Sequence, residues 1–62
     1  MNNERMLIDL AEVARLLSVS RPTVYTLMHR EFDPLPYIKM GRLTRVNVTA
    51  LNEWLERQGV ER

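Results

Sequence analysis

ARLLSVSRPTVY, residues 14–25, is the stretch that decides the fold of this 62-residue chain. Its apolar residues stop at a short polar break around Ser18 and resume after it. Ser20 stands where a helix N-cap is expected, and Pro22 falls in the first helical turn, where its missing N–H costs little. Two short helices joined so tightly cross at a large angle. The stretch therefore predicts a helix-turn-helix whose second helix runs from about residue 21 to residue 30.

The apolar residues around the break predict which sides of the two helices are buried. Six side chains are expected in the seam between them: Leu16, Leu17, Val19, Val24, Leu27 and Met28. Five side chains are left pointing away from it: Ser20, Arg21, Thr23, Tyr25 and Thr26. In a helix-turn-helix, the exposed first turns of the second helix can reach base edges in the major groove of DNA. These side chains are therefore candidate DNA contacts.

The segment before the break predicts a helix over residues 10–17. Asp9 followed by Glu12 is a capping-box pattern with aspartate as the cap. Apolar residues then recur at i, i+3, i+4 and i+7 and give a single buried stripe. Upstream, residues 1–7 are expected to form a loose N-terminal arm, with residues 6–8 laid on the core as a short extended piece.

The segment after the second helix predicts an extended connector and then a β hairpin. Pro34 and Pro36 forbid continued helix. Apolar and polar residues alternate over 37–40 and 43–46, on either side of Gly41, which can supply the positive φ of the turn. A lone hairpin is unstable in water, so this one must pack on the helices.

A last helix is expected over residues 50–58, with Thr49 as its cap and Gly59 as its stop. Its buried stripe is expected to consist of Leu51, Trp54 and Leu55. Three methionines are expected to fill gaps in the core: Met6, Met28 and Met40. Residues 8–58 would then form one mainly α-helical domain with a two-stranded β hairpin, followed by a tail at 59–62.

Composition restricts the chain to one small domain with a thin core. Hydrophobic residues make up 45% of it and there is no cysteine, which suits a reducing cytoplasm. The single histidine cannot build a metal site alone, so no metal or cofactor is expected. No apolar run approaches the roughly 18 residues of a membrane span. The lack of a Gly-rich phosphate loop and of a catalytic constellation argues against an enzyme.

Charge is distributed unevenly although the formal net charge is only +1. Residues 15–45 hold six basic and two acidic residues, whereas the flanking segments hold three basic and six acidic ones. This distribution predicts one face suited to phosphate groups, with the opposite side kept soluble. The alternative is a chance mixture of charges on a solvated surface.

The order of helix, turn, helix, hairpin and helix resembles a known family. The chain is similar to small excisionases and AlpA-type regulators, which are MerR-like winged helix-turn-helix proteins of prophages and other mobile elements. The matching segments are residues 10–17, 19–25, 35–36, 38–42, 45–46 and 51–55. They cover roughly residues 7–57. Two features depart from the family pattern: Ser18 replaces the expected turn glycine, and Asp33-Pro34 enlarges the connector.

The resemblance implies roles for the second helix. Seven residues match the recognition helix, which enters the major groove: Ser20, Arg21, Thr23, Tyr25, Thr26, His29 and Arg30. Arg21 is the expected base reader, because a bidentate guanidinium contact to guanine is the commonest specific one. Tyr25 matches a position that usually contacts the DNA backbone, although it could also belong partly to the core. His29 could instead interact with the C-terminal end of the helix dipole.

The resemblance also implies roles for the hairpin, which forms the wing and lies along the adjacent minor groove. Four residues match it: Lys39, Gly41, Arg42 and Arg45. Arg42 has no packing reason to stand at the hairpin tip, so insertion into a narrow minor groove is expected. Lys39 and Arg45 are expected to hold phosphates, with solvated strand residues as the alternative.

By this resemblance, the chain would be a monomeric protein of the bacterial cytoplasm, associated with the nucleoid, that binds double-stranded DNA. An excisionase binds as neighbouring copies, bends the attachment site and directs a tyrosine-family integrase toward excision. An AlpA-like regulator would use the same contacts at a prophage or integrase promoter. A protein-interaction module with solvated arginines is the remaining alternative. No small-molecule substrate is expected.

Overall fold

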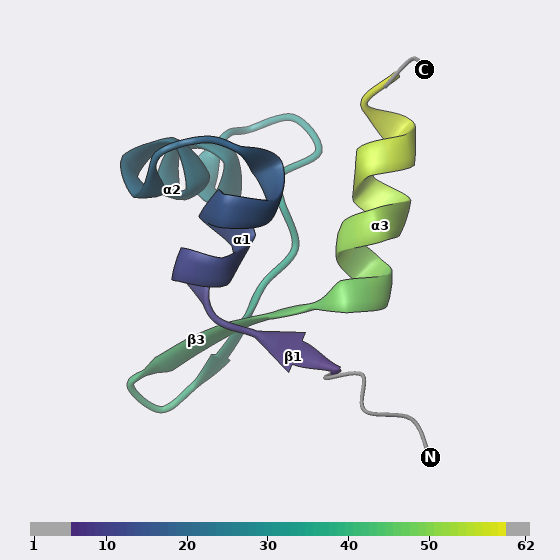
Figure 1. Cartoon of the computed structure of the whole chain (residues 1–62). Coiled ribbons are helices and arrows are strands. Elements are labelled where there is room, and N and C mark those ends of the chain that lie inside the picture. The colour runs from purple at the N-terminus through teal and green to yellow at the C-terminus, as the bar shows by residue number, and fades with distance from the viewer. Residues whose placement is uncertain (1–5, 60–62) are drawn as a thin grey trace.

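The computed structural model describes residues 6–59, so the first five residues of the expected arm and the last three of the expected tail lie outside the described residues. In chain order the elements are β1 (Leu7–Ile8), α1 (Leu10–Leu17), α2 (Arg21–His29), β2 (Ile38–Met40), β3 (Leu43–Asn47) and α3 (Val48–Arg57). The strands form one antiparallel sheet in the order β1-β3-β2. Figure 1 shows the β2–β3 hairpin extending from the α1–α2 pair, with α3 standing on the other side of the molecule. The predicted winged helix-turn-helix architecture is confirmed.

The turn between α1 and α2 is closed by backbone hydrogen bonds. Ser18 adopts the left-handed conformation with φ 59°, which glycine would adopt at less cost. The N–H of Val19 then donates to the carbonyl of Ala14 at 3.0 Å. Ser20 caps α2 as predicted, because its Oγ accepts the N–H of Thr23. The chain thus makes the tight turn without the glycine that the family pattern leads one to expect.

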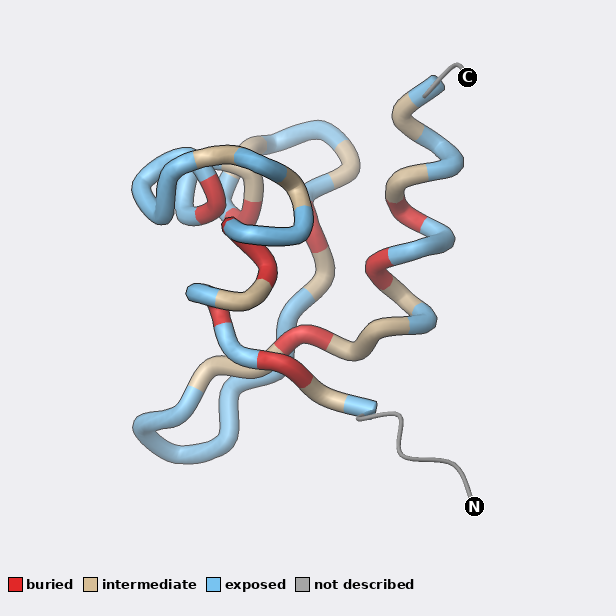
Figure 2. The backbone as a smooth tube through the Cα atoms, viewed as in Figure 1, coloured by how far each residue is buried: buried red, intermediate tan, exposed pale blue. Residues whose placement is uncertain are grey.

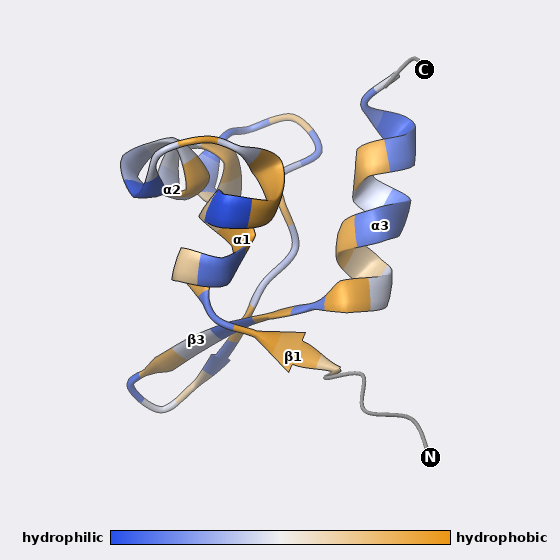
Figure 3. Cartoon of the chain, in the orientation of Figure 1, coloured by the Kyte–Doolittle hydropathy of each residue, from blue (hydrophilic) through white to orange (hydrophobic). Residues whose placement is uncertain are grey.

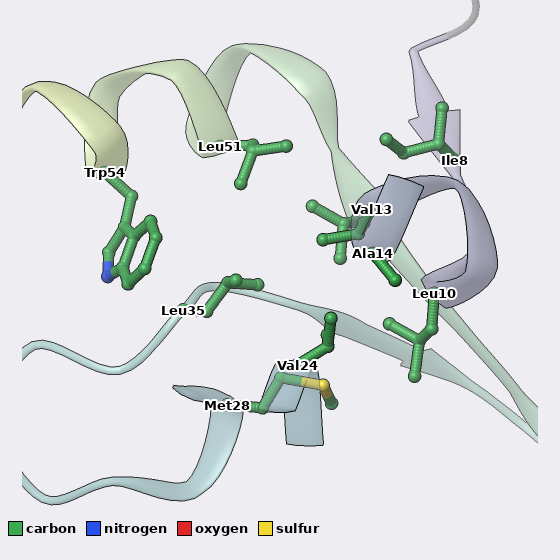
Figure 4. Packing of buried hydrophobic residues seen from close by; sticks show 10 residues of the cluster. Ile8, Leu10, Val13, Ala14, Val24, Met28, Leu35, Leu51 and Trp54 are labelled. Carbon is green, nitrogen blue, oxygen red and sulfur yellow. The ribbon is translucent and has the colours of Figure 1, made fainter. Parts of the chain in front are cut away.

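The core lies where the helix pair, the sheet and α3 meet (Figures 2 and 4). Its centre consists of Val13 from α1, Val24 from α2, Leu35 from the connector and Val46 from β3, all of them fully buried. The complete buried set is Ile8, Leu10, Val13, Ala14, Val24, Met28, Leu35, Val46, Leu51 and Trp54. Each fully buried side chain of this size contributes about 1.5–3 kcal/mol. The connector is therefore part of the core rather than a loose link.

Three apolar side chains that were expected inside the molecule are exposed. Leu16 is 55% exposed, Met6 74% and Met40 44%, so these three expectations were wrong. Leu16 lies off the buried stripe of α1, whose i, i+3, i+4, i+7 spacing points elsewhere. Met6 precedes the first strand, and Met40 stands on the hairpin beyond the core. Met28 is buried as expected.

The β2–β3 hairpin turns at Gly41, whose φ of +63° confirms the expected conformation. Ile38 lies opposite Arg45, and Met40 lies opposite Leu43 next to the turn. A Cβ added at Gly41 would meet nothing within 4 Å. Glycine is therefore favoured here by the backbone conformation and not by close packing.

Helix α3 begins earlier than expected. Asn47 caps it, because its Oδ1 accepts the N–H of Ala50 at 2.9 Å, whereas Thr49 lies exposed in the first turn. The expected cap at Thr49 was therefore wrong. The cause is β1, whose Leu7 pairs with Asn47 and keeps the chain extended up to that residue. Gly59, with φ +73°, follows the end of the helix as predicted.

The corrected cap can be tested by two alanine variants. Asn47→Ala should lower the free energy of unfolding by about 1 kcal/mol, because the N–H of Ala50 no longer has its acceptor. Thr49→Ala is the matched control and should change that free energy by less than about 0.5 kcal/mol. Urea denaturation followed by circular dichroism measures both. A larger loss for Thr49→Ala than for Asn47→Ala would contradict the assignment.

The connector is attached to α3 by polar contacts around Asp33, which has a positive φ of 47°. The Asp33 carbonyl accepts Nε1–H of Trp54 at 2.7 Å and Nη2–H of Arg30 at 3.0 Å. Its carboxylate accepts two bonds from Arg57, at 2.8 and 3.2 Å, and one from Gln58 at 2.9 Å. We call these five residues the Asp33 cluster. The cluster fixes the path from α2 to the wing relative to α3.

The Asp33 cluster should make stability depend on pH in acid. Hydrogen bonds from Arg57, and then from Gln58, lower the pKa of Asp33 in the folded state. The associated stabilisation is fully present above the ordinary aspartate pKa and is lost as the pH falls through the lowered folded value. We expect the Tm difference between wild type and Asp33→Asn to shrink over that range, as measured by thermal melts from pH 7 to pH 2. Parallel curves for the two proteins would contradict this.

Candidate nucleic-acid interface

An open groove of about 340 Å³ runs between the helix pair and the wing. Its lining comes from the start of α1, the first turns of α2 and the hairpin: Asp9, Leu10, Ala11, Arg21, Tyr25, Arg42, Leu43, Thr44 and Arg45. Three guanidinium groups thus share the groove with the one carboxylate of Asp9. That carboxylate is already used as the cap of α1, where it accepts the N–H of Glu12 at 2.9 Å. The groove is therefore basic.

Arg21 stands in the first turn of α2 and projects into this groove. Within residues 6–59, the ion pairs join Arg15 to Glu12 and Arg57 to Asp33, so Arg21 has no carboxylate partner there. A cation in the first turn is disfavoured by the positive end of the helix dipole. An anionic ligand in the groove would offset the unfavourable interaction of the Arg21 cation with the helix dipole.

The hydroxyl groups on the exposed face of α2 are used partly within the helix. Ser20 Oγ and Thr23 Oγ1 are 2.9 Å apart and share a hydrogen bond beside the cap. The Thr26 hydroxyl donates to the carbonyl of Pro22 at 3.2 Å. All three side chains are exposed. The oxygen of each threonine can still accept a hydrogen bond. The three side chains are therefore accessible to an outside partner, although none of them lines the groove.

Tyr25 and His29 follow on the same helix. Tyr25 is half exposed and lines the groove. It is not one of the side chains that pack against the core, so the alternative that Tyr25 belongs partly to the core is not supported. His29 Nδ1 lies 3.0 Å from the Tyr25 carbonyl and must donate to it, because a carbonyl only accepts. The His29 ring also meets Tyr37 edge-on, with the ring centroids 5.9 Å apart. His29 is exposed at the end of α2.

Arg30 does not join the candidate interface. Helix α2 ends at His29, and Arg30 has an extended backbone with ψ 158°. Its guanidinium reaches Gln58 Oε1 at 2.6 Å and lies 5.2 Å from the Trp54 ring centroid. The residue is therefore a structural member of the Asp33 cluster. We correct the sequence-based assignment of Arg30 to the exposed helix face accordingly.

The wing places its basic residues on both faces of the hairpin. Arg42 lies exposed in the turn, and Arg45 is half-buried, with its Nη1 donating to the Thr44 carbonyl at 2.9 Å. Both line the groove. Lys39 lies opposite Thr44 in the register and projects, exposed, from the other face of the hairpin than Arg45. The structure thus groups Arg42 and Arg45 with Arg21 and leaves Lys39 to one side.

Five groove residues were not among the predicted contacts: Asp9, Leu10, Ala11, Leu43 and Thr44. The first three reach the groove because the pairing of β1 with β3 brings the start of α1 beside the wing. That pairing is a long-range contact with no local sequence pattern. Leu43 and Thr44 could have been found from the strand register, since they adjoin Arg42 and Arg45.

The chain belongs to a family of helix-turn-helix domains, which it matches over residues 7–59. It is also similar to two curated proteins of Mycobacterium tuberculosis, from strains CDC 1551 / Oshkosh and ATCC 25618 / H37Rv, each named as a candidate DNA-binding protein. Each is 44% identical over 50 residues, which is 81% of this chain but 62% of the relative. The match therefore spans less than two thirds of those relatives. No solved structure matches significantly, and no helix within residues 6–59 is long and apolar enough to cross a membrane.

Proposed function

We propose that this chain binds specific double-stranded DNA, with α2 in the major groove and the wing in the adjacent minor groove. The observation that carries the proposal is the basic groove where Arg21 of α2 converges with Arg42 and Arg45 of the wing. Membership of a helix-turn-helix family and similarity to candidate DNA-binding proteins support it. The acidic residues Glu53 and Glu56 are exposed on α3, away from that groove.

The groove suits the sugar–phosphate strand that separates the two DNA grooves. The major groove, about 12 Å wide, admits an α-helix, so α2 can enter with Arg21 toward the base edges. The wing then meets the neighbouring minor groove, where Arg42 finds enhanced negative potential. Between them, Arg45 and the Tyr25 hydroxyl are placed to hold phosphate oxygens of the same strand. Ser20, Thr23, Thr26 and His29 complete the proposed helix contacts, and Lys39 the wing contacts.

Within this class, we propose that the protein is an excisionase. The ordered resemblance over most of the chain is the support. A single DNA-binding module covers only about 600–1,000 Å², so useful specificity requires several adjacent sites. Copies side by side on an attachment site would provide that footprint and would bias a tyrosine-family integrase toward excision.

The experiment combines binding and recombination on DNA from the encoding element. We expect discrete, salt-sensitive mobility shifts at repeats beside an attachment site, and a higher excision yield when the protein is added to the integrase. Binding only at a promoter, with unchanged excision, would support an AlpA-like regulator. No binding above background at moderate salt would refute DNA binding and favour a protein-interaction module.

A further inference from the structure

We propose that the wing carries an apolar wedge, formed by Met40 and Leu43, that enters the minor groove and unstacks one base step. The inference rests on the proposed DNA-binding function and adds how the protein deforms its site. Met40 is 44% exposed, Leu43 50% and Ile38 40%, although each is a large apolar residue. Three such side chains gathered on one short hairpin form an apolar surface that the core does not explain.

The strand register places the wedge at the outer end of the hairpin. Met40 lies directly opposite Leu43 on either side of the turn, and Ile38 lies opposite Arg45. Residues directly opposite in an antiparallel pair project from the same face. Val46 is two residues from Thr44 and fully buried, so its face of β3 is the one directed at the core. The face with Met40 and Leu43 therefore turns away from the core.

The figures agree with this placement. Figure 2 shows the hairpin turn and the strand ends beside it as exposed, whereas β3 has a buried segment farther from the turn. In Figure 3 the outer end of β3 is hydrophobic and adjoins hydrophilic ribbon at the turn. The hydrophobic end of β3 thus adjoins a hydrophilic turn and lies outside the buried part of the strand.

Charge complementarity selects DNA as the occupant. Arg42 lies in the turn between Met40 and Leu43, and Leu43 itself lines the basic groove together with Arg42, Arg45 and Arg21. The occupant must therefore present anionic groups and apolar surface within a few ångströms of each other. The minor groove offers both, with phosphates at its edges and base faces once a step opens. Wedges of Leu, Ile, Met or Phe inserted there kink DNA by about 20–90°.

The Met40 side chain has a suitable shape for insertion between bases. Met40 is unbranched and adapts to irregular gaps. Pyrimidine–purine steps are the easiest to unstack, so the proposal predicts such a step under the wing. Specificity would then come partly from deformability, at a position where no base edge is read.

The test compares the wild type with a Met40→Thr/Leu43→Thr variant on a fragment holding one binding site. Fluorescence energy transfer between end labels measures the bend, and 2-aminopurine placed at successive steps reports unstacking. For the wild type we expect a bend and a fluorescence rise at one step. The double variant should lose both signals. The salt dependence of binding should be the same for the double variant as for the wild type. The affinity of the double variant should be lower by less than about tenfold, because the variant also avoids the free-energy cost of unstacking the DNA.

Leu16→Thr is the matched control, since Leu16 is equally exposed but lies on α1. It should keep both signals, and a single Met40→Gln variant covers the case in which the double variant folds poorly. Wild-type binding without unstacking would overturn the wedge and leave DNA binding standing. Loss of cooperative binding at adjacent sites, with the bend at one site kept, would overturn it in favour of a contact between copies. No DNA binding at all would refute the proposed function itself.

Discussion

Replacing Trp54 with alanine is expected to remove about half or more of the free energy of unfolding of this domain at 25 °C. Trp54 is only 3% exposed and packs with Leu51 and Leu35 in the core (Figure 4). Its Nε1–H donates to the Asp33 carbonyl at 2.7 Å, and its ring lies under the Arg30 guanidinium. Truncating a buried aromatic side chain costs about 3–5 kcal/mol. A domain of this length has about 3–9 kcal/mol of stability in total.

The loss can be divided between packing and the indole hydrogen bond. Trp54→Phe keeps an aromatic ring but removes the donor, so we expect it to cost about 1–2 kcal/mol. Leu55→Ala, on the same helix but only partly buried, is the control for a general loss of apolar surface and should cost less than Trp54→Ala. Urea denaturation followed by circular dichroism measures all three. A cooperative transition for Trp54→Ala within about 1 kcal/mol of wild type would contradict the central place of this residue.

The helix-turn-helix could be predicted because its signals are local. Asp9 and Ser20 each cap a helix through the N–H three residues later, and the buried stripes follow the helical period. The same holds for the hairpin, where Gly41 and the alternation on either side define the turn. Trp54 was placed in the core by its spacing from Leu51. In each case the deciding contact lies within a few residues of the pattern that predicts it.

Leu16 was misplaced for a local reason, because it lies off the buried stripe of its own helix. Other errors involve segments that lie far apart in the chain. Asn47 and Thr49 are both good caps by residue type, and only the pairing of Asn47 with Leu7 decides between them. Arg30 has the spacing of an exposed helix residue, but it is held by Gln58, which is 28 residues away in sequence. Met40 fits a filler by composition, yet the hairpin extends beyond the core and leaves it exposed.

For the candidate site, the sequence indicated the residue types and the structure shows which of them meet. Arg21, Tyr25, Arg42 and Arg45 share one groove, although up to 24 positions separate them in the chain. That convergence depends on the connector, which is anchored by buried Leu35 and by the Asp33 cluster. No single motif encodes it.

Arg21→Ala and Arg42→Ala should weaken DNA binding in distinguishable ways. Removing a bidentate base contact at Arg21 should reduce affinity for the specific site by about 5- to 150-fold, which corresponds to 1–3 kcal/mol. Affinity for unrelated DNA should fall much less, so the ratio of specific to non-specific affinity should also fall. Arg42→Ala should instead weaken binding to both kinds of DNA, because the wing contact depends on charge and groove shape. Titrations against specific and scrambled duplexes separate the two patterns.

The salt dependence of binding tests whether the groove, and not the overall charge, holds the DNA. Removing one side chain that neutralises a phosphate should reduce the slope of log K against log salt by about 0.9. Arg45→Gln should therefore flatten the slope, because its guanidinium lies in the groove. Arg57→Gln also removes one positive charge, but Arg57 pairs with Asp33 at the end of α3, outside the groove. For Arg57→Gln, the slope of log K against log salt should match that of the wild type when both are measured below the melting temperature of the variant. An equal reduction of this slope in both variants would mean that DNA binding depends on net charge alone. The proposed interface would then lose its main support.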